Sequence, residues 1–233
     1  KTPKWAYYNM EVKAFGDSWA YGAELNEDEK PYPHWMAQQL GVEYSNYGVE
    51  GFSLGNVLQT IVANVKQIEN DDIVTVIIPP DVRWYDESEE AGFHNMYSME
   101  GTGNLTKRYK EFLGNKSLRW FEYHHAVFVY TIQKILNDRG CRYSMIHNYG
   151  QIDKIHEFGL AIDRKKFLDS KSLTEILTER NKFLRLFQTY NADLWDGPAE
   201  EDFRGQYFEG CKTHPNELGH KRIAKLFIDY FKL

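Results

Sequence analysis

Two short segments near opposite ends of the chain carry residues that could act together as a nucleophile and a base. Ser18 ends the segment Phe-Gly-Asp-Ser and follows an apolar run at residues 12–15, which predicts a serine just past a strand. His214 opens the segment His-Pro-Asn-Glu-Leu-Gly-His and precedes an amphipathic stretch that predicts a helix. A serine hydroxyl becomes a strong nucleophile when a histidine accepts its proton, so the pair indicates hydrolytic chemistry at an acyl group.

The sequence between these two residues predicts strands and helices in alternation. Pro31 and Gly41 bound a short helix, and Ser53 is a good N-cap for the amphipathic helix that follows. Strands are expected at residues 12–15, 43–46, 73–78, 143–147 and 192–195, and helices at 32–40, 54–68, 118–137, 173–190 and from 216 onward. This alternation predicts one α/β domain over residues 1–233, a three-layer α/β/α sandwich with a mostly parallel, flavodoxin-like sheet of about five strands.

Residues 81–115 interrupt the alternation. They are rich in Gly, Asn, Glu, Tyr and Trp and show no sustained period. An irregular stretch of that length inside a compact domain is usually functional or forms a lid. We interpret it as an insertion within the single domain.

The composition of the 233-residue chain argues against several classes of partner. A net charge of −6 disfavours a nucleic-acid backbone, because that partner needs a basic face. No stretch approaches the ~20 apolar residues of a membrane span, and the first residues show no signal peptide, so we expect a soluble protein of unassigned compartment. No residue set has the spacing of metal ligands, and none implies a cofactor. The aromatic content of 15% suits either stacking on sugar rings or contacts with another chain, so an oligomer or a larger assembly stays open.

The predicted topology brings the candidate residues to one place. In an open parallel sheet the site forms at the carboxyl ends of the strands, where several loops meet. Ser18 follows the first strand, Gly51 the second and residues 79–83 the third, while His214 lies on the loop before the last helix. We therefore expect all of them at the same edge of the sheet.

Three segments in this order resemble blocks one, two and five of the SGNH (GDSL-like) hydrolase superfamily. They are residues 15–18 (Phe-Gly-Asp-Ser), 46–53 (Asn-Tyr-Gly-Val-Glu-Gly-Phe-Ser) and 214–220 (His-Pro-Asn-Glu-Leu-Gly-His). The resemblance implies that Ser18 is the nucleophile and that its backbone N–H is one oxyanion donor. It also implies that Gly51 supplies a second backbone donor and that His214 is the general base.

The third block departs from the family pattern. The family places an asparagine there as a third oxyanion donor, whereas this chain has Ile-Pro-Pro-Asp at residues 78–81. Pro80 cannot donate a hydrogen bond from its side chain or its backbone. We expect Arg83 to be the nearest substitute donor, with Trp84 lining the same wall as a substrate-binding residue.

The acid that orients the histidine is also replaced. In the family an aspartate lies three residues before the histidine, and here that position is Cys211, whose thiol is a weak acceptor. Glu209 is the acid we expect to take over, with Asp202, Asp196 or a backbone carbonyl as alternatives.

Plain structural roles are possible for the same residues. Ser18 could be a helix N-cap after a tight turn, and residues 214–216 could simply cap the last helix. His220 lies one helical turn further on, and packing or surface exposure accounts for it better than a second catalytic role.

The function predicted from the sequence is a serine esterase or deacylase whose substrate is a small-molecule or glycan acyl ester, such as an O-acyl group on a carbohydrate. Two alternatives remain open at this point. The chain could be a non-catalytic SGNH-like module that binds glycans or serves an assembly. It could also be an O-acyltransferase that uses Ser18 and His214 but passes the acyl group to a sugar hydroxyl.

Overall fold

The computed structural model describes residues 10–80, 118–148, 157–178, 206–207 and 214–233. Within them, four parallel strands form one sheet in the order β2-β1-β3-β4: β1 (Glu11–Gly16), β2 (Glu43–Gly48), β3 (Ile73–Ile78) and β4 (Arg142–His147). This is the order of the first four strands of a flavodoxin-like sheet, which confirms the predicted fold class. The strand expected at 192–195 lies outside the described residues.

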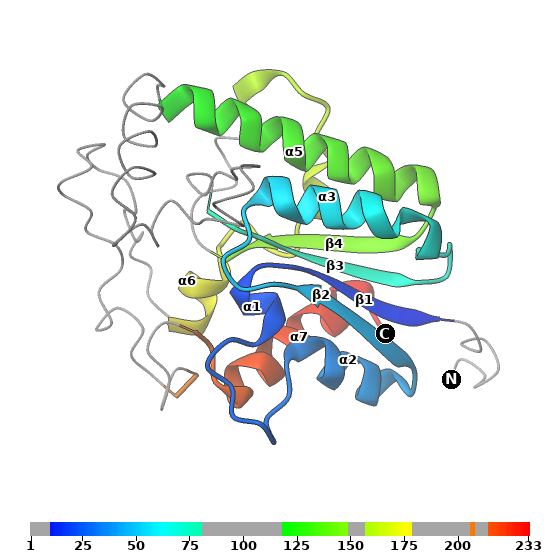
Figure 1. The fold of residues 1–233 in the computed structure, drawn as a ribbon, viewed down its shortest axis with the longest axis vertical. Helices are drawn as coiled ribbons and strands as arrows, with labels where there is room; N and C mark the ends of the chain where they lie inside the picture. The colour runs from blue at the N-terminus through cyan, green and yellow to red at the C-terminus, as the bar shows by residue number, and fades with distance from the viewer. Residues whose placement is uncertain (1–9, 81–117, 149–156, 179–205, 208–213) are drawn as a thin grey trace, which may run out of the picture.

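Helices cover both faces of the sheet (Figure 1). Helices α2 (Tyr32–Leu40) and α7 (Glu217–Phe231) pack on one face, and α3 (Leu54–Asn64) and α5 (Leu118–Arg139) on the other. The short helices α1 (Ser18–Tyr21) and α6 (Leu173–Thr178) lie at the carboxyl end of the strands, at the left of Figure 1, and two single turns complete the described elements, η2 (Val65–Gln67) and η4 (Arg164–Lys166). The structure therefore has the three layers that the alternation predicted.

The bounds of the helices follow from their end residues. Helix α2 begins after Pro31 and ends at Gly41, whose φ of 70° closes the helix in the left-handed region that glycine favours. Helix α3 begins with a capping box, in which the Ser53 side chain accepts from the Asn56 backbone and the Asn56 side chain accepts from the Ser53 backbone. Both starts agree with the predictions made from these residues.

The two helices on the lower face are joined by a histidine. Burial excludes water from the start of α2, and the backbone N–H of Tyr32 donates there to Nδ1 of His220 on α7, at 3.2 Å. The Tyr32 ring stacks on His220 and on Phe227 of the same helix. His220 is therefore a packing residue that caps a helix 188 residues away in the sequence.

A buried charge cluster lies at the amino end of the sheet. The Lys13 ammonium, whose side chain is 5% exposed, pairs with the carboxylates of Glu11 and Asp72. Asp72 also accepts hydrogen bonds from the backbone N–H groups of Glu11 and Glu69. Burial alone would lower the pKa of Lys13, but the two carboxylates outweigh it and the pKa lies above its ordinary value.

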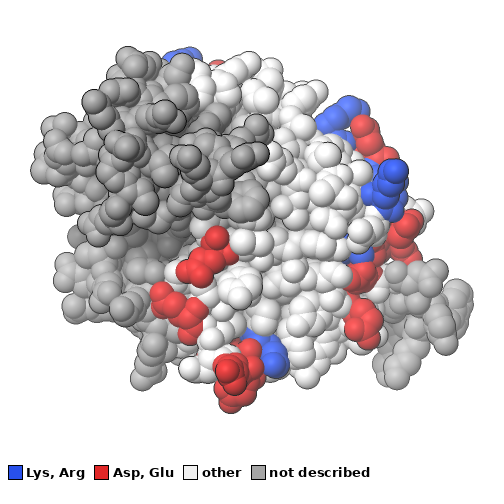
Figure 2. All heavy atoms as spheres, in the orientation of Figure 1, with Lys and Arg blue, Asp and Glu red and all other residues white. Residues whose placement is uncertain are grey.

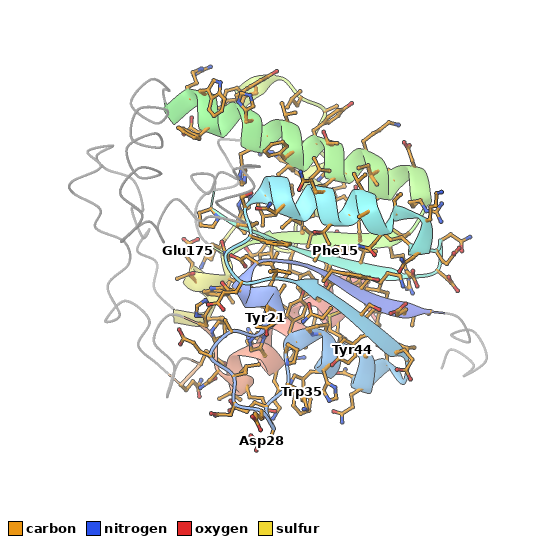
Figure 3. All side chains as sticks on the ribbon, in the orientation of Figure 1. Phe15, Tyr21, Asp28, Trp35, Tyr44 and Glu175 are labelled. Carbon is orange, nitrogen blue, oxygen red and sulfur yellow. The ribbon has the colours of Figure 1, made fainter. Side chains whose placement is uncertain are left out.

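On the face shown in Figure 2, the charged side chains of the described residues form separate small groups. Acidic side chains gather at its lower edge, where the loop that bears Asp28 lies (Figures 2 and 3). Among the described helices, none combines the length and the apolar character needed to cross a bilayer.

Candidate active site

Ser18 lies where the first strand turns directly into a helix. Asp17 is the N-cap of α1, and its Oδ1 accepts from the backbone N–H of Trp19 at 3.1 Å. Ser18 is thus the first residue of the helix, and the N-cap role that we considered for it belongs to its neighbour Asp17. At 2% exposure the residue is held in a fixed environment at the carboxyl end of β1.

The Asp17 carboxylate connects three strand ends. Its Oδ2 accepts from the side-chain amide of Asn148, which follows β4, at 2.6 Å. The backbone N–H of Asn148 donates in turn to the carbonyl of Ile78 at the end of β3. The Asn148 carbonyl accepts from both the backbone N–H and the hydroxyl of Thr174 on α6. This buried network fixes the backbone on either side of Ser18, and no sequence pattern indicated that Asn148 takes part in it.

The loop that carries Gly51 packs against the same helix. Gly48 lies so close to α1 that a Cβ there would approach the backbone nitrogen of Tyr21 to 2.4 Å, so only glycine fits. The next N–H, of Val49, donates to the carbonyl of Gly16 at 3.3 Å. Gly51 itself has a φ of 80°, which also favours glycine. The structure therefore brings the Gly51 loop to the end of β1 and against helix α1, whose first residue is Ser18.

His214 contacts a carboxylate that the sequence did not indicate. Its Nδ1 lies 2.8 Å from Oε1 of Glu24, with the two side chains 15% and 28% exposed. An ionised carboxylate only accepts hydrogen bonds, so this contact places the proton on Nδ1 and leaves Nε2 as the basic nitrogen.

The backbone places Glu24 next to the serine. After α1, the N–H groups of Gly22 and Ala23 both donate to the carbonyl of Ser18, each at 3.0 Å. Glu24 is the following residue, so His214 is held by the turn that begins at Ser18. This turn joins the two segments from which the sequence predicted catalysis.

Three solved structures have a similar arrangement of elements. A protein described as a GDSL-like lipase from Parabacteroides merdae aligns over 96% of this chain and 95% of its own, with a TM-score of 0.51 and 10% identity. The chain has the SGNH hydrolase fold. A protein described as a lipolytic protein of the G-D-S-L family from Desulfitobacterium hafniense covers 95% of this chain and 99% of its own, with a TM-score of 0.47 and 14% identity. An acetylxylan esterase from Geobacillus stearothermophilus covers 97% of this chain and 95% of its own, with a TM-score of 0.46 and 14% identity.

Comparison of the sequence itself adds nothing to this assignment, since no protein-family model matches it and no curated protein does either. The SGNH fold is therefore recognised through its topology and the three short blocks.

Several predicted site residues lie outside the described part of the SGNH fold. They are Arg83, Trp84 and Glu209, together with Cys211, and their roles stay predictions. Pro80 is described and buried at the end of β3. Among the described residues, no group of three or more His, Cys, Asp or Glu side chains is placed to hold a metal ion.

Proposed function

We propose that this chain is a serine ester hydrolase in which Ser18 is the nucleophile and His214 the general base. The observation that carries the proposal is the contact of His214 with Glu24, because Glu24 ends the turn that begins at Ser18. With the proton on Nδ1, the lone pair that can accept the serine proton is on Nε2. The tight turns around Ser18 and Gly51 support their backbone N–H groups as the oxyanion donors.

The reaction proceeds in two balanced steps. The Ser18 Oγ attacks the acyl carbon while His214 Nε2 takes the hydroxyl proton, and the leaving alcohol departs with that proton as the ester C–O bond breaks. Water then attacks the acyl-serine, giving one proton to His214, which returns it to Oγ as the free acid leaves. Arg83 remains our candidate for a third oxyanion donor in place of Pro80.

An O-acyl group on a carbohydrate is the substrate class that we propose. Tyr21, three residues after Ser18 at the end of α1, is 55% exposed (Figure 3). An exposed aromatic ring beside a nucleophile offers a surface on which a sugar ring can stack. The aromatic surplus of the whole chain supports the same preference.

A fluorophosphonate probe tests the mechanism directly. We expect the probe to label Ser18, as located by peptide mass spectrometry, and p-nitrophenyl acetate to be hydrolysed. Ser18→Ala should abolish both, whereas Ser170→Ala, at an exposed serine, should leave both unchanged. Full esterase activity in Ser18→Ala would exclude this mechanism.

The two alternative functions are separate outcomes of that experiment. A chain that folds but is never labelled at Ser18 would be the non-catalytic module. Labelling at Ser18 together with transfer of the acyl group to an added sugar, rather than release of free acid, would identify an acyltransferase.

A further inference from the structure

We propose that Glu24 is the acid that positions His214, in place of a carboxylate three residues before the histidine. The inference rests on the proposed function, since it assigns a positioning residue to the same site. The family pattern puts the acid and the histidine on one loop. Here the carboxylate at hydrogen-bond distance comes from the segment that carries the nucleophile, 190 residues away.

The contact is well suited to that role. The Nδ1-to-Oε1 distance of 2.8 Å is that of a charge-assisted hydrogen bond, and the two side chains are 15% and 28% exposed. A carboxylate on Nδ1 fixes the tautomer and the ring orientation, and it stabilises the imidazolium that forms when the serine proton is taken up.

The backbone conformation of Glu24 is the second observation. Its φ of 67° lies in the left-handed region, which non-glycine residues rarely adopt and which costs free energy. Among the described residues the other non-glycine case is Lys232, which closes the end of α7. Helix α1 already closes at Gly22, so Glu24 ends no helix. Such conformations are concentrated at functional sites, and at Glu24 the unfavourable conformation presents the carboxylate to His214.

Nearby carboxylates are committed elsewhere. Asp17 holds the N–H of Trp19 and the amide of Asn148. Glu29, on the same loop as Glu24, accepts from the backbone and side-chain nitrogens of Asn26. Of the three, Glu24 is the carboxylate that reaches His214.

The test compares Glu24→Gln with Glu27→Gln, which makes the same chemical change at an exposed position on the same loop. The measurement is the rate at which fluorophosphonate labels Ser18 as a function of pH. Loss of a triad acid costs about 10⁴-fold in buried sites, and for this partly exposed pair we expect a loss of about 10–100-fold in Glu24→Gln. Glu24→Asp should label Ser18 faster than Glu24→Gln does, and Glu27→Gln should label it at the wild-type rate.

Rescue by the conservative variant separates positioning from a structural role. Glu24→Asp restores a carboxylate, so it should label Ser18 faster than Glu24→Gln does across the pH range. The melting temperature should stay within a few degrees of wild type, and Glu24→Gly, which relieves the backbone, should match or exceed it while labelling slowly.

Two outcomes overturn the inference in distinguishable ways. If wild type is labelled at Ser18 and Glu24→Gln reacts at the same rate with the same profile, Glu24 is not the positioning acid and the proposed function stands. If folded wild type is not labelled at all, the proposed function fails and takes this inference with it.

Discussion

The charged side chains at the two ends of the sheet have different kinds of partner. At the amino end, Lys13 is surrounded by Glu11 and Asp72, and the three charges satisfy one another within the strands and the turn before β3. At the carboxyl end, the carboxylates of Asp17 and Glu24 contact groups of another kind. Asp17 binds a backbone N–H and an amide, and Glu24 binds an imidazole.

In the proposed mechanism, this difference separates charges that stabilise the fold from charges that position Ser18 and His214. A lysine between two carboxylates gains from each contact and needs no unusual backbone. At the other end the carboxylates fix the positions of Ser18 and His214, and one of them requires a residue in the left-handed region. Substitutions of charged residues at the amino end should therefore affect the free energy of unfolding alone. Substitutions at the carboxyl end should mainly affect the rate at which Ser18 reacts.

The largest expected effect on stability comes from Lys13→Met. The substitution keeps the bulk of the side chain but leaves the Glu11 and Asp72 carboxylates without their cation, which should cost about 3 kcal/mol. Urea denaturation measures the loss. The labelling rate of Ser18 in the folded fraction should not change, and a rate loss comparable to that of Glu24→Gln would contradict the separation of roles.

Acid should destabilise the protein through two buried histidines, His220 and His125. Burial lowers the pKa of His220 to about 3, with His214 adding to the effect, and burial lowers the pKa of His125 to about 3 as well. Between pH 6.5 and 3 the unfolded chain binds these protons and the folded chain does not. The contribution of these neutral histidines to the free energy of unfolding is therefore fully present above pH 6.5. It falls on acidification by up to about 1.4 kcal/mol per pH unit for each histidine.

His220→Asn isolates one of these contributions. The asparagine oxygen can still accept the Tyr32 N–H, but the side chain no longer titrates. The pH slope of the unfolding free energy should fall by one histidine's share, although overall stability drops because the ring contacts are lost. An unchanged slope between pH 4 and 6 would show that His220 does not contribute.

A smaller effect on stability, a gain rather than a loss, is expected for Glu24→Gly. Glycine adopts a positive φ without a steric penalty, which favours Glu24→Gly by about 1 kcal/mol, whereas the lost ion pair costs between 0 and about 1 kcal/mol. Thermal unfolding should give a melting temperature equal to or slightly above that of wild type. A clear decrease would mean that the contact with His214 matters more for folding than for the site.

The smallest effect concerns substrate choice at Tyr21. Loss of a stacking ring is worth about 1 kcal/mol, so Tyr21→Ala should raise KM several-fold for an acetylated oligosaccharide. The rate with p-nitrophenyl acetate should stay constant. Equal changes with both substrates would argue against a sugar-stacking role.

Much of the fold was predictable because local signals and tertiary structure agree. Pro31 and Gly41 predicted the bounds of α2 correctly. The β-branched run at 73–78 predicted a strand, and that strand is buried along its whole length. Helix α1 was missed because four residues are too few to show a helical period. Its cap, Asp17, was visible only as part of the serine motif.

The contact of His214 with Glu24 could not be predicted in the same way. It joins residues 190 positions apart, and Glu24 lies in a loop with several other carboxylates. The family pattern pointed instead to a carboxylate near Cys211. A positive φ at glutamate has no local sequence signal, so the residue became visible only through its geometry.

The packing of α7 on α2 has a consequence for when the chain can become active during its synthesis. The turn with Ser18 and Glu24 emerges early, but His214 and the helix that anchors it are made almost two hundred residues later. Until α7 docks through His220 and Phe227, His214 cannot reach the Glu24 turn, and the proposed mechanism lacks its base. Under that mechanism a ribosome-bound chain would carry an unreactive serine, and acyl chemistry would begin only once folding had joined the two segments.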